Sequence, residues 1–74
     1  MINLAVLGLG IWGQRHVRSA RSSGRFNVTM AIDPDSVRAA PVAEELGLIF
    51  SSTIEDALSN KNIDAVSLAT PHTL

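Results

Sequence analysis

The sequence contains no cysteine, so neither a disulfide framework nor a thiolate metal site can form. It also lacks a long apolar run. Its apolar opening, residues 4–12, is far shorter than a membrane span, and residues 1–3 bring no basic side chain of the kind that starts a secretion signal. Six basic residues against seven acidic ones leave a net charge of −1, which gives no electrostatic reason to bind nucleic acid or an anionic membrane. We therefore expect a cytoplasmic protein with neither kind of partner.

The apolar residues are grouped into four short segments that are typical of strands buried on both faces of a parallel sheet. These segments are residues 2–7, 27–33, 48–50 and 63–69. Internal repeats and linkers are absent, and 74 residues can form at most one small domain. The sequence therefore predicts a single α/β unit with about four strands.

Helical spacing appears between these strands. In the first interval Gly13, Val17 and Ala20 share one face up to Gly24, while the arginines from position 15 to 25 are interpreted as a solvated face. In the second interval Pro41 would cost roughly 3 kcal/mol inside a helix. We therefore expect that helix to start late, near Pro41, or to kink there.

The third interval opens with residues 52–55, Ser-Thr-Ile-Glu, which fit a capping box in which Ser52 and Glu55 each satisfy a free amide. A brief helix should follow, with Ile54, Ala57 and Leu58 directed inward.

Strands that alternate with helices over connections this long must pair in parallel through right-handed crossovers. In the usual doubly wound order, the first two helices cover one face of the sheet and the fourth strand lies beside the first. The other face then has only the short third helix, although a parallel sheet needs both faces covered. We therefore predict an incomplete Rossmann-type fold. Residues 1–74 would be the first part of a longer chain, and they would be marginally stable or self-associating alone.

A glycine motif joins the first strand to the first helix, and it reads Gly8-Leu9-Gly10-Ile11-Trp12-Gly13. Gly8 permits a tight turn, Gly10 lets bare backbone approach a pyrophosphate, and Gly13 lets the helix pack closely. The free amides of Ile11, Trp12 and Gly13 would then donate to phosphate oxygens at the positive end of the helix dipole. A plain strand-to-helix turn is the alternative interpretation.

An acidic residue at the tip of the second strand supports the cofactor interpretation. Asp33 stands twenty positions after Gly13, where its carboxylate can accept hydrogen bonds from both adenosine ribose hydroxyls. A 2′-phosphate at about 4 Å would be repelled by roughly 4 kcal/mol, so we expect NAD, with NADP disfavoured. Arg38 could soften this preference by contacting the adenosine end, or it could simply face solvent.

The loop after the fourth strand, Thr70-Pro71-His72, should border the nicotinamide half of the cofactor, because ligands lie where strand order reverses. His72 could act as a proton shuttle, but it has no visible partner in the sequence. His16, one turn past the glycine motif, is interpreted as a structural histidine with a satisfied hydrogen bond.

Together these segments resemble the amino-terminal domain of the Gfo/Idh/MocA group of oxidoreductases over the whole chain. The resemblance is carried by residues 5–13 (AVLGLGIWG) with His16 behind them, 31–35 (AIDPD), 43–47 (AEELG) and 63–71 (IDAVSLATP). It implies NAD- or NADP-dependent oxidation or reduction of a sugar, cyclitol or related alcohol. In the group the catalytic lysine lies in a Glu-Lys-Pro motif on the next strand, and further catalytic residues come from a carboxy-terminal α/β domain. The resemblance therefore implies that residues 1–74 are the amino-terminal part of a dinucleotide-binding domain, without that motif and without the carboxy-terminal substrate domain.

Two departures from the group stand out. His72 replaces the asparagine that often follows the Thr-Pro pair, and Pro41 interrupts a helix that is usually regular. We assign no catalytic residue and no metal ligand to these 74 positions.

Two functions from different classes fit these observations. The first is a homo-oligomeric oxidoreductase whose cofactor-binding part is seen here, with a small-molecule substrate bound elsewhere. The second is a non-catalytic regulator that senses the nicotinamide pool through the same fold, and a reductase of another dinucleotide-dependent family is a weaker third. A Glu-Lys-Pro motif downstream would favour the enzyme.

Overall fold

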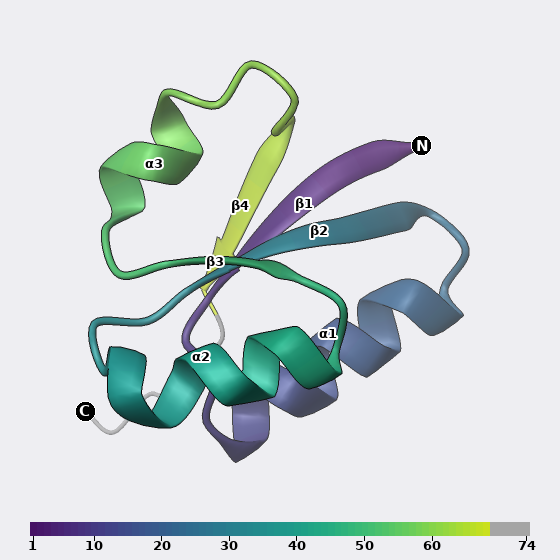
Figure 1. Ribbon diagram of the computed structural model, residues 1–74. Helices are drawn as coiled ribbons and strands as arrows, with labels where there is room; N and C mark the ends of the chain where they lie inside the picture. The colour runs from purple at the N-terminus through teal and green to yellow at the C-terminus, as the bar shows by residue number, and fades with distance from the viewer. Residues whose placement is uncertain (69–74) are drawn as a thin grey trace, which may run out of the picture.

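The computed structural model describes residues 1–68, and within them strands and helices alternate as the sequence predicts (Figure 1). The elements are β1 (Ile2–Leu7), α1 (Ile11–Ser22), β2 (Phe26–Ile32), α2 (Ser36–Glu45), β3 (Ile49–Ser51), α3 (Ile54–Leu58) and β4 (Ala65–Leu68). The bounds of β1 are the predicted ones, and the bounds of the other three strands differ from the predicted ones by one or two residues. The predicted end of the fourth strand, Ala69, lies outside the described residues.

The strands form one parallel sheet in the order β3-β2-β1-β4, which confirms the predicted position of the fourth strand beside the first. Because all strands run the same way, their carboxyl ends share one edge, and α1 and α2 begin there. The order reverses between β1 and β4. In folds of this kind, ligands bind at the carboxyl edge beside such a reversal. Among residues 1–68, no helix combines the length and the apolar character needed to cross a membrane.

The two faces of the sheet are covered unequally, as the sequence predicts. Figure 1 shows α1 and α2 on one side of the sheet and α3 on the other. Side chains alternate along β1, so Leu4 and Val6 join a core of ten buried residues under α1 and α2. Ala5 points to the opposite face, where the buried cluster contains only four residues. The larger core therefore lies on the side that carries the start of α1.

The short helix α3 differs from its prediction. Ala57 is buried, but Leu58 is 70% exposed and Ile54 is 39% exposed, so the expectation that all three point inward is wrong for Leu58 and largely wrong for Ile54. A helix of five residues covers too little of the sheet to bury more than one of its side chains.

The predicted capping box at the start of α3 is also wrong. The cap is Thr53, whose side chain makes no capping hydrogen bond. Ser51, at the end of β3, organises this turn instead, since its hydroxyl accepts from the amide of Thr53 and donates to the carboxylate of Asp56.

Helix α2 begins at Ser36, so the predicted late start near Pro41 is wrong. Asp35 caps the helix by accepting a hydrogen bond from the amide of Arg38, and the helix continues through Pro41. The amide that Pro41 lacks would pair with the carbonyl of Val37 one turn earlier. Both residues lie on the exposed side of the helix, where water can bond that carbonyl instead. This start places Arg38 in the first turn of α2.

Candidate cofactor site

The glycine motif forms a tight turn between β1 and α1. Gly8 has a φ of +94°, a conformation that residues with a Cβ rarely adopt, and its amide donates to the carbonyl of Ile32 at 2.7 Å. Leu9 is completely buried and anchors the middle of the turn in the core. Gly13 is buried in the first turn of α1, which agrees with the predicted close packing of helix and sheet.

Within residues 1–68, neither the backbone conformation of Gly10 nor its packing requires a glycine. Its φ of −73° suits any residue, and an added Cβ would meet nothing within 4 Å. Neither backbone strain nor packing therefore accounts for the missing side chain. The open space directly above Gly10 fits a ligand that approaches the bare backbone, as a pyrophosphate does in dinucleotide-binding folds.

The amides that follow Gly10 are available to such a ligand. The helical ladder begins with the amide of Gln14, which donates to the carbonyl of Gly10 at 3.0 Å. Among residues 1–68, no acceptor pairs with the amides of Ile11, Trp12 and Gly13. The first turn of α1 carries no acidic residue, so nothing there opposes an anion. Free donors and the helix dipole together favour a phosphate at this point.

Asp33 lies beside this turn, directly after β2, with only 5% of its surface exposed. One carboxylate oxygen, Oδ2, accepts from the amide of Leu9 at 2.9 Å and from Arg38 at 2.6 Å. The other oxygen, Oδ1, accepts from the amide of Asp35 at 2.9 Å. Asp33 thus ties the glycine turn to the start of α2, and Oδ1 keeps capacity for one further donor.

These contacts determine the ionisation of Asp33. Burial raises the pKa of its carboxyl, but the amides of Leu9 and Asp35 and the Arg38 guanidinium together lower it by more. The net pKa lies below the ordinary value for aspartate, so the carboxylate is charged at neutral pH.

Arg38 lies between the glycine turn and Asp33 and does not simply face solvent. One guanidinium nitrogen donates to Asp33 and another donates to the carbonyl of Leu9 at 2.9 Å. A weaker ion pair of 3.4 Å joins it to Asp35, and 45% of the side chain remains exposed. The guanidinium therefore neutralises the Asp33 carboxylate, the group that the sequence predicts as the ribose acceptor.

A cleft of about 500 Å³ opens at the carboxyl ends of the strands, on the α3 side. It joins Gly8 and Asp33 to Pro34, Ile54 and Leu68, three residues that the sequence did not single out for the site. Their positions along the chain could have indicated them. Pro34 follows β2, Leu68 ends β4, and Ile54 starts α3, so all three lie at the carboxyl edge of the sheet. The volume and the apolar lining suit a flat heterocyclic ring.

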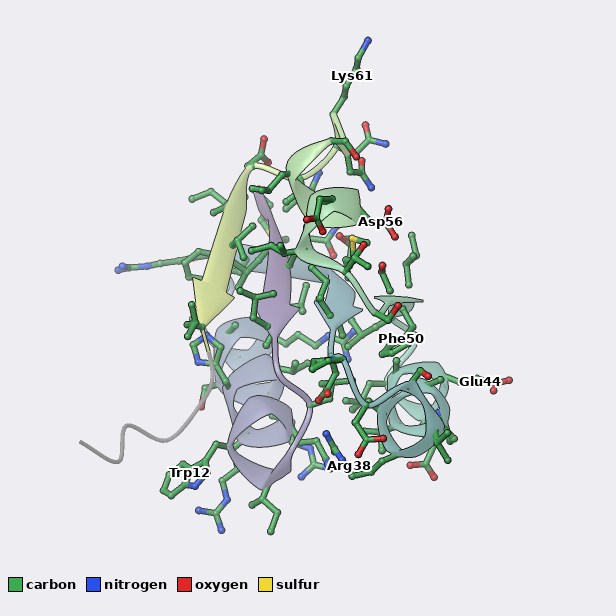
Figure 2. The ribbon with its side chains drawn as sticks, turned by 90° about the vertical axis from the view of Figure 1, so that its left-hand side faces the viewer. Trp12, Arg38, Glu44, Phe50, Asp56 and Lys61 are labelled. Atoms are coloured by element: carbon green, nitrogen blue, oxygen red, sulfur yellow. The ribbon has the colours of Figure 1, made fainter. Side chains whose placement is uncertain are left out.

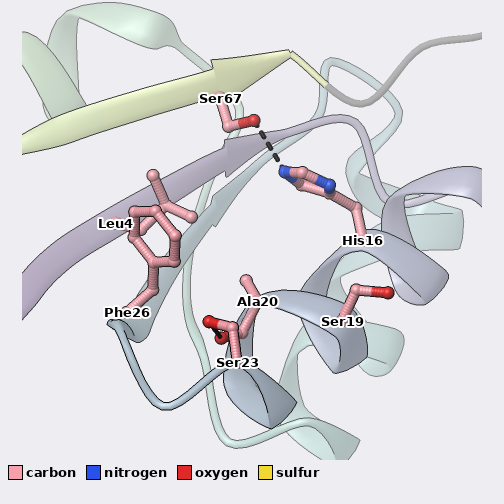
Figure 3. A pocket seen from close by; sticks show the side chains of 7 residues that line it. All are labelled: Leu4, His16, Ser19, Ala20, Ser23, Phe26 and Ser67. Atoms are coloured by element: carbon pink, nitrogen blue, oxygen red, sulfur yellow. Dashed lines mark hydrogen bonds between the residues drawn. The ribbon is translucent and has the colours of Figure 1, made fainter.

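His16 has a partner on the neighbouring strand, as expected for a structural histidine. Its Nε2 lies 2.6 Å from the hydroxyl of Ser67 on β4, and the pair lines a cavity of about 410 Å³ with Leu4, Ala20 and Phe26 (Figure 3).

The predicted loop residues Thr70, Pro71 and His72 lie outside the described residues. Within residues 1–68, no group of three or more histidine or carboxylate side chains is placed to hold a metal ion.

A parallel sheet with a glycine turn, a free helix N-terminus and an acid after β2 defines the dinucleotide-binding class of α/β domains. Within this class, residues 2–74 match the family model Gfo/Idh/MocA, described as an oxidoreductase family with an NAD-binding Rossmann fold. The chain belongs to this family.

Known relatives agree with this assignment. The chain is 32% identical over its whole length to an uncharacterized oxidoreductase of Streptococcus pneumoniae, and covers 20% of it. It is 36% identical over 73 residues, 95% of the chain, to an inositol 2-dehydrogenase of Corynebacterium glutamicum, of which it covers 21%. A solved structure of GenD2 from gentamicin A biosynthesis, in complex with NAD, superposes with a TM-score of 0.84 at 26% identity, over 95% of the chain and 20% of GenD2. The chain thus spans about a fifth of the length of these proteins.

Proposed function

We propose that this chain holds NAD(H) for an oxidoreductase that transfers hydride to or from an alcohol carbon of a sugar, cyclitol or related compound. The observation that carries the proposal is Gly10, whose missing side chain is not required by packing or strain within residues 1–68 and would be explained by an approaching ligand. The proposed contacts to the cofactor are Gly8, Gly10, Ile11, Trp12, Gly13, Asp33, Arg38, Thr70, Pro71 and His72. The bound nicotinamide supplies the hydride acceptor or donor, and the residues described here bind and orient it.

Three parts of the site would each hold one part of the cofactor. The free amides of Ile11, Trp12 and Gly13 suit the pyrophosphate. The Oδ1 atom of Asp33 has capacity for one ribose hydroxyl, and binding of a second at Oδ2 requires Arg38 to move aside. The cleft between Pro34, Ile54 and Leu68 suits the adenine ring.

The charge balance around Asp33 bears on the choice between NAD and NADP. An isolated carboxylate would repel a 2′-phosphate, but Arg38 already neutralises this one at 2.6 Å. We propose NAD as the cofactor, with a preference over NADP that Arg38 reduces.

We propose that the residues acting on the substrate lie in the part of the relatives that this chain does not span. The name of the inositol 2-dehydrogenase relative supports a cyclitol or sugar alcohol as the substrate.

We further propose a cytoplasmic, homo-oligomeric enzyme, of which these 74 residues alone are inactive. The alternative is a regulator that binds the same cofactor without turnover. Reduction of NAD by myo-inositol, glucose, glucuronate or glucose 6-phosphate, followed at 340 nm with the complete gene product, would favour the enzyme.

The test of cofactor binding uses Gly10→Ala and Gly10→Val. Because a Cβ at this position meets nothing, both variants should keep the melting temperature of the cofactor-free protein within a few degrees. NADH affinity, measured by calorimetry on the complete gene product, should fall for alanine and by at least about a hundredfold for valine, since the side chain occupies the phosphate position. Ser19→Val, on an exposed part of α1, is the control and should leave affinity unchanged. A Gly10→Val protein that binds NADH as tightly as the parent would contradict the proposal.

A further inference from the structure

An aromatic side chain stands in solvent beside the proposed site. Trp12, in the first turn of α1, is 56% exposed, although burying an indole is among the largest apolar gains available to a chain. The guanidinium carbon of Arg15 lies 5.5 Å from the centroid of its ring, within cation–π range. The chain thus keeps an oriented indole and arginine on its surface.

This pair lies on the β4 side of α1. Residues 12 and 16 are one turn apart on the same helix face, and His16 contacts Ser67 of β4 at 2.6 Å. Helix α1 starts at the carboxyl edge of the sheet, so Trp12 lies one turn closer to that edge than His16. Figure 2 shows Trp12 and Arg38 on opposite sides of the start of α1.

If the chain binds NAD as proposed, the position of Trp12 and Arg15 on the β4 side of α1 assigns them to the nicotinamide half of the site. Asp33 and Arg38 take the adenosine ribose, and the pyrophosphate crosses the free amides at the start of α1. The nicotinamide half, with the substrate next to it, then lies on the other side of the start of α1, away from Arg38 and on the α1 face of β4, whereas the adenine cleft opens on the α3 face. This is the side on which Trp12 and Arg15 stand.

The chemistry of the pair favours an anionic ligand. A guanidinium that stacks on an aromatic face keeps the donors along its edge free, and their fork matches a carboxylate or a phosphate. Among residues 1–68, no carboxylate lies within 4.0 Å of Arg15, and α1 contains no acidic residue. The exposed indole offers a flat apolar surface to the C–H face of a ring.

We propose that Trp12 and Arg15 form a substrate subsite that selects a hydroxylated ring bearing an anionic group, carboxylate or phosphate. The indole would pack against the ring, and Arg15 would pair with the anion. The subsite narrows the proposed substrates from neutral sugars and cyclitols to acidic or phosphorylated ones.

The test uses the complete gene product saturated with NADH, which cannot oxidise an alcohol, so that calorimetry measures binding alone. The probes are glucuronate, glucose 6-phosphate and the neutral match glucose. We expect at least one anionic probe to bind about tenfold more tightly than glucose, and the preferred anion identifies the charged group. Arg15→Gln should remove this difference, and Arg15→Lys, which keeps the charge without the planar fork, should restore part of it. The control Arg18→Gln removes an exposed cation from the same helix and should retain the difference.

The outcomes separate this proposal from the proposed function. Failure of the parent protein to bind NADH would overturn the cofactor site and the subsite together. Normal NADH binding with neither anion preferred over glucose, or a preference that survives Arg15→Gln, would overturn the subsite alone. A loss of NADH affinity in Arg15→Gln that matches the loss for the anionic probe would assign Arg15 to the cofactor's own phosphates and would also overturn it.

Discussion

Two arginines flank the start of α1, and their surroundings differ sharply. Arg38 donates to the carboxylate of Asp33 and to the carbonyl of Leu9, so its charge is already paired within the protein. Arg15 is oriented by the ring of Trp12 and has no carboxylate partner within residues 1–68. The comparison shows that an arginine near the ligand-binding edge can either neutralise a carboxylate of the protein or remain available to a ligand. Which of the two it does depends on whether a carboxylate lies beside it.

The largest effect expected from this comparison concerns cofactor choice. Arg38→Gln leaves the Asp33 carboxylate without its cation, so a 2′-phosphate meets an uncompensated negative charge. Discounted for the half-exposed position of Arg38, the added discrimination against NADPH is about 2 kcal/mol, or thirtyfold. Calorimetric titrations of NADH and NADPH measure this ratio. Arg15→Gln is the matched control and should leave it unchanged; an equal change in both variants would remove the distinction between the two arginines.

A smaller effect concerns stability in acid. The pKa of Asp33 is lower in the folded chain than its ordinary value, so its contribution to the free energy of unfolding is complete above about pH 4. That contribution is lost as the pH falls through the folded pKa. Asp33→Asn should cost about 1–2 kcal/mol at pH 7, because charged hydrogen bonds are replaced by neutral ones, and less at pH 3. Urea unfolding followed by circular dichroism tests this, and an equal cost at both pH values would contradict it.

The local parts of the site could be predicted from sequence, because strand, glycine turn and helix follow one another directly. The positions of Gly8, Gly10 and Gly13 in the turn needed no long-range information. The contact between Asp33 and Arg38 could not be predicted in the same way. It depends on α2 starting at Ser36, and a start near Pro41 would leave Arg38 before the helix.

The burial of the α3 side chains was predicted wrongly for a different reason. A helical pattern shows which residues share a face, but not how much sheet that face covers. Ile54 and Leu58 share a face with Ala57, yet only Ala57 is buried beneath the five-residue helix. For the same reason Ile54 was predicted as a core residue, whereas it lines the cleft proposed for adenine.

The central claim is that the backbone amides at the start of α1 bind a diphosphate, and amide chemical shifts report on it directly. Proton–nitrogen NMR spectra of the ¹⁵N-labelled complete gene product would be recorded during titration with ADP-ribose, which carries the diphosphate without nicotinamide. The account predicts the largest downfield amide proton shifts at Ile11, Trp12 and Gly13, with little change at Val17 deeper in the helix. Shifts centred away from residues 10–13, or none at a concentration that saturates binding, would contradict it.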